Sequence, residues 1–158
     1  MSLLLSVYVT CVVVLYIKFL VATGIQAIKT FDAGARPPED KDLPLAKGRP
    51  TQNYGLHTGE DDEAMKKAKE VELRWKRIIM NDLESIPLAL IVFGAGLLAP
   101  KTNEGVHVAA LIVYTVLRCF HTYAYANSLQ PHRAMCWRFG VLAILVGGFN
   151  AMVGAYRS

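Results

Sequence analysis

Four polar residues enter a long apolar stretch of the sequence at helical spacing. They are Arg74, Arg77, Asn81 and Glu84. Their spacings of three, four and three residues place them on one face of a helix. The apolar residues that follow run to residue 99, and charged groups in such a membrane-length helix are costly unless they face other protein. This face is therefore expected to point into a helical bundle, either as a structural ion-pair network or as contacts to a ligand.

A second polar stripe lies in the apolar stretch at residues 106–126. Its members are Tyr114, Arg118, His121, Thr122 and Tyr125. Their intervals again favour one face of a helix. His121 is either a ligand contact or a hydrogen-bonded residue of the bundle, and Tyr125 is either a ligand contact or an interfacial aromatic. For Arg118, an ion pair within the bundle is the alternative to a ligand role.

Isolated basic residues mark the other apolar stretches. Arg133 opens the last one, where it either anchors a helix at the membrane surface or binds an anion with help from the helix dipole. Arg138 follows and is expected to extend toward the interface. Lys18 interrupts the first stretch, so it must face protein, although the sequence does not name its partner.

The composition is that of a membrane protein. Of the 158 residues 53% are hydrophobic, and the mean hydropathy is +0.30. Four stretches are apolar and long enough to cross a bilayer. They lie at about residues 3–28, 74–98, 106–126 and 133–156. The prediction is therefore one all-α membrane domain over residues 1–158, an up-down four-helix bundle, with Pro87 expected to kink the second helix.

Charge is concentrated between the first two crossings. Residues 29–77 hold 11 of the 17 Lys and Arg residues and 10 of the 13 Asp and Glu residues. Four of the seven prolines predict an extended loop at the start of this interval, and acids followed by bases from residue 61 predict an aqueous helix that continues into the second crossing. We expect residues 29–73 in the cytosol by the positive-inside rule. Because acids are interleaved with the bases, no nucleic acid partner is expected.

The three cysteines are predicted to be buried free thiols. Cys11, Cys119 and Cys136 are an odd number, and each lies in an apolar stretch. Neither cysteines nor histidines show metal-ligand spacing, so we expect no metal site.

Four motifs in order along the chain resemble the MAPEG family, the membrane-associated proteins of eicosanoid and glutathione metabolism. They are P-P-E-D at residues 37–40, R-x-x-x-N-D-L-E at 77–84, R-x-x-H-T-x-x-Y at 118–125 and Q-P-H-R at 130–133. The chain looks most similar to the microsomal glutathione transferase and prostaglandin E synthase branches. The resemblance implies a homotrimer in the endoplasmic reticulum, with glutathione as co-substrate between protomers near the cytosolic face.

The resemblance also implies roles for individual residues. Glutathione-binding positions fall on Arg77, Asn81, Glu84, His121, Tyr125 and Arg133. Arg133 matches the arginine that stabilises the glutathione thiolate, so it is the expected catalytic residue. Supporting positions fall on Asp40, Arg74, Arg118 and Lys18.

The implied chemistry is nucleophilic attack by a thiolate. A free thiol with a pKa near 8.5 is only a few per cent ionised at neutral pH, and a neighbouring guanidinium favours the anion. Ile79, Met80 and Ala134 depart from the family's usual residues, two of them from those of prostaglandin E synthases. A transferase of broader scope is therefore favoured, acting on lipophilic electrophiles or lipid hydroperoxides. The alternatives are a prostaglandin E synthase-type isomerase and a non-catalytic lipid-binding protein of the same architecture.

Overall fold

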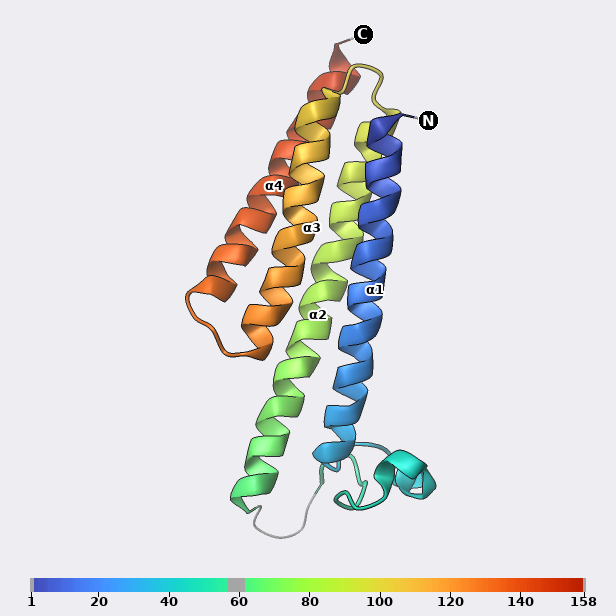
Figure 1. Cartoon of the computed structure of the whole chain (residues 1–158), viewed down its shortest axis with the longest axis vertical. Helices are drawn as coiled ribbons and strands as arrows, with labels where there is room; N and C mark the ends of the chain where they lie inside the picture. The colour runs from blue at the N-terminus through green and yellow to red at the C-terminus, as the bar shows by residue number, and fades with distance from the viewer. Residues whose placement is uncertain (1, 57–61, 158) are drawn as a thin grey trace. The chain divides into compact units, whose positions relative to one another are not determined.

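The computed structural model describes residues 2–56 and 62–157, and these residues form helices and loops with no β-strand. The elements are α1 (Leu3–Asp32), η1 (Pro38–Asp42), η2 (Pro44–Ala46), α2 (Glu63–Leu98), α3 (Glu104–Ala126) and α4 (His132–Tyr156) (Figure 1). Each of the four α-helices is long and apolar enough to cross a membrane. The prediction of an all-α four-helix membrane fold is confirmed.

Local capping residues set several helix ends. Asp62 accepts a hydrogen bond from the Met65 amide at 2.7 Å, and α2 begins directly after it. Asn103 caps α3 in the same way, accepting from the Val106 amide at 3.1 Å. Gly34 follows the end of α1 with a φ of 62°, a left-handed conformation that glycine adopts without strain.

Helix α2 joins the predicted aqueous extension and the second crossing into one element. It is 36 residues long, and the helix continues through Pro87. At about 1.5 Å per residue it is longer than a bilayer is thick. Its polar first turns therefore extend beyond the hydrocarbon layer.

The chain divides into two compact units, which are described separately. The four-helix unit comprises residues Met1–Phe19 and Asn81–Ser158, and the hairpin unit comprises Leu20–Met80. Helices α1 and α2 contribute to both units, whereas α3 and α4 belong to the four-helix unit.

The core of the four-helix unit is formed by one inward face of each helix. Leu15 of α1, Phe93 of α2 and Tyr114 of α3 are at most 1% exposed, and Ala143 of α4 closes the cluster. The Tyr114 hydroxyl lies 3.0 Å from the Ser85 hydroxyl, so its polar tip is satisfied inside the core. Helix packing in lipid depends on such close contacts more than on the hydrophobic effect.

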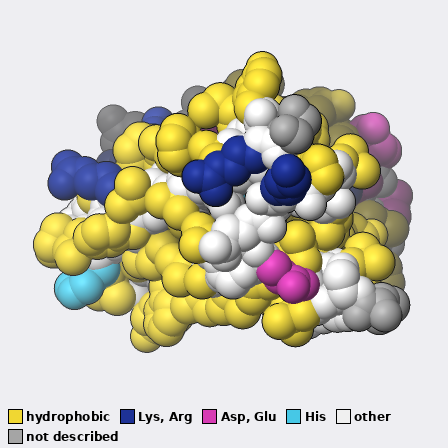
Figure 2. Space-filling model, turned by 90° about the horizontal axis from the view of Figure 1, so that it is seen from above, with side chains coloured by type: hydrophobic (Ala, Val, Ile, Leu, Met, Phe, Trp, Pro, Cys, Tyr) yellow, Lys and Arg dark blue, Asp and Glu magenta, His cyan; other side chains and the backbone are white. Residues whose placement is uncertain are grey.

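The outward faces of the same helices are apolar. Leu88, Ile91, Leu145 and Phe149 are 62–69% exposed. The start of α1 and the end of α4 lie at one end of the four-helix unit (Figure 1), and hydrophobic side chains predominate in the view from that end (Figure 2). Large exposed hydrocarbon surface on four crossing helices is the pattern of a protein surrounded by lipid.

Small residues on α4 allow its close approach to neighbouring segments. A Cβ atom at Gly147 would lie 2.4 Å from the Phe93 ring. At Gly154 it would lie 2.5 Å from the backbone nitrogen of Thr102, and the Gly154 carbonyl accepts from the Lys101 amide at 3.3 Å. Backbone cannot swing aside as a side chain can, so Gly154 is the tighter constraint.

Gly154→Ala should lower the free energy of unfolding by about 1–3 kcal/mol, because the new methyl group overlaps the backbone of the α2–α3 loop. Thermal unfolding of the detergent-solubilised protein measures the change. Gly24→Ala is the control, since nothing lies within 4 Å of a Cβ atom there and a helical alanine is intrinsically favoured. Equal melting of Gly154→Ala and the unaltered protein would contradict the close approach.

The loop of the hairpin unit is folded, which corrects the prediction of an extended segment. Gln52 is 2% exposed and donates to the carbonyls of Phe31 at 3.1 Å and Pro50 at 2.7 Å. Its side-chain oxygen accepts from the Arg36 amide at 3.2 Å. The buried amide of Gln52 thus holds together chain segments that the composition predicts to be extended. The sequence could not show this, because hydrogen-bond partners distant in the chain leave no local pattern.

Candidate functional site

A cavity of about 320 Å³ lies in the four-helix unit, where α2, α3 and α4 come together near the turn between α3 and α4. Its lining residues are Asn81, His121, Tyr125, Arg133, Ala134, Trp137 and Arg138. The first four are residues that sequence analysis proposed as ligand contacts. The structure therefore gathers one residue of α2, two of α3 and one of α4 at a single site.

Arg133 is held over an aromatic ring at the start of α4. Its guanidinium carbon lies 4.3 Å from the ring centroid of Tyr125, a cation–π distance. The ring of His121 meets Tyr125 edge-on, with centroids 5.8 Å apart. With its amide oxygen turned toward α4, Gln130 accepts from Arg133 Nε at 3.2 Å. These contacts orient a guanidinium where the first amides of α4 also favour an anion.

A buried ion cluster adjoins Asn81 and consists of Lys18, Asp82 and Arg118. Arg118 donates from Nη1 to Asn81 Oδ1 at 2.9 Å and from Nη2 to Asp82 Oδ1 at 2.5 Å. Lys18 Nζ donates to the other carboxylate oxygen of Asp82. The side chains of Lys18, Asp82 and Arg118 are 10%, 0% and 3% exposed. Two cations thus share one carboxylate inside the unit, and each is hydrogen bonded to it.

Nearly the whole chain matches a known protein family. Residues 4–153 match the MAPEG family. The chain belongs to the MAPEG family. No curated protein and no solved structure matches it. Membership confirms the resemblance drawn from the four motifs and, with the four membrane-length helices, shows an integral membrane protein of this family.

The inward face of α2 in this MAPEG protein differs from the predicted one. Asp82 is 1% exposed, and Ile86, Ala89 and Phe93 continue the buried face at spacings of four, three and four residues. Asn81 of the predicted face lines the cavity, but Glu84 is exposed, so the expected contact of Glu84 with other protein is not made within the single chain. Glu84 lies two residues from Asp82, which is about 200° around a helix, so both cannot face the same core.

The partner of Lys18 is the residue that sequence analysis missed. Asp82 was quoted as part of the N-D-L-E motif but was given no role, and the structure places it at the centre of the ion cluster. A signal was present, since acids in membrane-length helices usually have a buried partner. Arg118 does not line the cavity but donates to Asn81, which does, and its expected supporting role stays a prediction.

Three other predicted residues belong to the hairpin unit. Asp40 accepts from Arg36 Nε at 2.7 Å, so its contact within the unit is local. Arg77 is exposed and Arg74 is partly exposed. Their expected roles as glutathione or supporting contacts stay predictions.

Two further cavity residues come from α4. Trp137 and Arg138 line the cavity, although Arg138 was expected to extend to the interface and Trp137 was not singled out. The spacing of four between Arg133 and Trp137, and between Ala134 and Arg138, is the signal that places them on the same side of α4 as Arg133.

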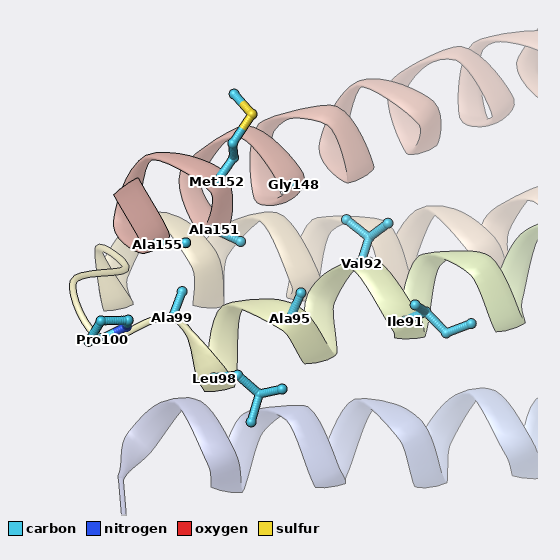
Figure 3. A pocket seen from close by; sticks show the side chains of 10 residues that line it. All are labelled: Ile91, Val92, Ala95, Leu98, Ala99, Pro100, Gly148, Ala151, Met152 and Ala155. Atoms are coloured by element: carbon cyan, nitrogen blue, oxygen red, sulfur yellow. The ribbon is translucent and has the colours of Figure 1, made fainter. Parts of the chain in front are cut away.

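Two apolar pockets elsewhere in the four-helix unit have no titratable side chain among their described lining residues. One of about 570 Å³ lies between α2 and α4, lined by side chains such as Val92, Ala95 and Met152 (Figure 3). Another, of about 520 Å³, is lined by α3 and α4 with aliphatic and Phe139 side chains. Such surfaces accept hydrocarbon, so they offer lipid contact rather than a reactive centre.

Proposed function

We propose that this chain is a glutathione-dependent membrane enzyme that conjugates glutathione to lipophilic electrophiles or reduces lipid hydroperoxides. The observation that supports it best is the cavity in which Arg133 lies over Tyr125, next to His121. MAPEG proteins include glutathione transferases and isomerases, so the family agrees with this chemistry.

In this proposal Arg133 contributes a positive charge and does not act as a general base. A guanidinium stays protonated at any physiological pH, so it stabilises the thiolate electrostatically while water or buffer takes the thiol proton. The thiolate sulfur then forms a bond to the electrophilic carbon, and the leaving group departs with its electron pair. The positive end of α4 adds to the stabilisation of the anion.

A conjugation assay tests the proposal. Purified protein, glutathione and a chlorodinitrobenzene-type acceptor should give a conjugate at a rate that saturates with glutathione. Glutathione binding without conjugation or hydroperoxide reduction would indicate an isomerase. Absence of glutathione binding would indicate the non-catalytic lipid-binding alternative and overturn the proposed function.

A homotrimer is part of the proposal. Glu84 is a charged residue on the exposed face of a membrane-crossing helix, where lipid would solvate it poorly and a second protomer could cover it. Size measurement of detergent-solubilised protein, corrected for bound detergent, should give three chains. A monomer that still turns over would rule out a site completed by a neighbouring protomer.

We further propose that the protein resides in the endoplasmic reticulum with its hairpin unit in the cytosol, because most of its Lys and Arg residues lie there. Protease added to sealed microsomes should then cut between Lys29 and Lys69. Cleavage that requires opened vesicles would mean the reverse orientation.

A further inference from the structure

Asn81 stands between the cavity and the buried ion cluster, and its amide has two chemically different ends. We propose that Arg118 is a positioning residue that takes the oxygen end of this amide, so that the N–H₂ end serves the cavity and selects a carboxylate of the bound ligand. This inference rests on the proposed function and deepens it, since it assigns one part of glutathione to the cavity.

Arg118 engages both oxygens of Asn81. Its Nη1 donates to the side-chain Oδ1 at 2.9 Å, and its Nη2 donates to the backbone carbonyl at 3.2 Å. An asparagine amide has one oxygen that accepts and one nitrogen that donates. With the oxygen bonded to Arg118 and the side chain lining the cavity, the donor is the group left for a ligand.

The burial and bonding of Arg118 keep the Asn81 amide in this orientation. Arg118 is 3% exposed as a side chain and is also bonded to Asp82, which is fully buried. A guanidinium has donors only, so an amide turned the other way would set two donors against each other in a buried place. Lys18 on the far side of Asp82 is a second cation, so the cluster attracts oxygen acceptors and not donors.

Donors predominate in the rest of the cavity lining, although His121 in its neutral form offers one acceptor nitrogen beside its N–H donor. Arg133, Arg138 and Trp137 carry donors only, and Tyr125 can donate from its phenol. No carboxylate occurs among the described residues that line the cavity. A wall of donors that includes two guanidinium groups fits an anionic acceptor, so the carboxylate end of glutathione matches this cavity and its ammonium group does not.

The test compares three ligands by calorimetric titration of the detergent-solubilised protein. They are glutathione, its glycine monoethyl ester, and 4-aminobutyryl-cysteinylglycine, which lacks the γ-glutamyl carboxylate. We expect at least one analogue to bind about tenfold or more weakly than glutathione, because it lacks one charge-assisted contact. The readout is the dissociation constant of that analogue divided by the dissociation constant of glutathione. This ratio does not depend on the overall stability of the protein.

Asn81→Asp should weaken glutathione binding by about tenfold or more and bring that ratio close to one, because a carboxylate replaces the N–H₂ group while Arg118 keeps its oxygen partner. The melting temperature should not fall, since the cluster of two cations and one acid gains a second acid. Asn150→Asp makes the same chemical change at an asparagine bonded to Asn103, outside the cavity, and should leave the ratio unaltered.

Arg118→Lys tests the positioning role itself. Lysine keeps a charge for Asp82 but lacks the planar fork that also holds Asn81, so the ratio should fall. An unchanged ratio in both Asn81→Asp and Arg118→Lys, or an equal loss of affinity for all three ligands, would overturn the inference and leave the proposed function standing. Failure of the unaltered protein to bind glutathione would overturn both.

Discussion

Arg133→Ala should reduce turnover by about 30- to 1,000-fold while the protein stays folded. Under the proposed function the guanidinium stabilises the thiolate before and during attack, and loss of one such contact typically costs about 2–4 kcal/mol in the activation barrier. Arg133 is partly exposed at the start of α4, so its removal should hardly affect packing. Ultraviolet absorbance of the thiolate on addition of glutathione provides the direct measurement.

Two variants sharpen the test of Arg133. Arg133→Lys keeps the charge but loses the fork and part of the stacking on Tyr125, so it should recover only part of the rate. Arg138→Ala removes another cationic side chain from the same cavity and should have the smaller effect, because Arg138 is the more exposed of the two. Equal thiolate signals and equal rates in the unaltered protein and Arg133→Ala would contradict a catalytic role and indicate that Arg133 serves only as a membrane anchor.

Asp82→Asn should strongly destabilise the four-helix unit. The substitution leaves Lys18 and Arg118 buried without their shared carboxylate, and removal of one partner of a buried ion pair typically costs about 3–5 kcal/mol. Thermal unfolding in detergent should show the loss. Lys18→Met should cost less, because it leaves one cation paired with one acid.

Glu84→Gln is the matched control for this prediction. It makes the same acid-to-amide change two residues away on α2, at an exposed side chain, so unfolding of the protomer should be nearly unaffected. A change in glutathione affinity in this variant would instead support a contact completed by a neighbouring protomer. Similar melting of Asp82→Asn and Glu84→Gln would contradict the role of the ion cluster.

The sequence by itself determined the four helices and the membrane setting. Apolar length is a local property, and a backbone in lipid must satisfy its hydrogen bonds within each segment, so long apolar stretches have few alternatives to helix. Proximity of His121, Tyr125 and Arg133 also follows from local connections. His121 and Tyr125 are one helical turn apart, and Arg133 follows after a short turn.

Only the tertiary structure decided which side of α2 is buried. Spacing shows that two residues share a helix face, but the neighbouring helices determine which face becomes the core. Asp82 rather than Glu84 faces the bundle because Lys18, 64 positions away on α1, and Arg118, 36 positions away on α3, meet it there. Contacts between residues so distant in sequence leave no periodic trace, so the sequence could signal that Lys18 and Asp82 each need a buried partner but could not pair them with each other, with Arg118 or with Asn81.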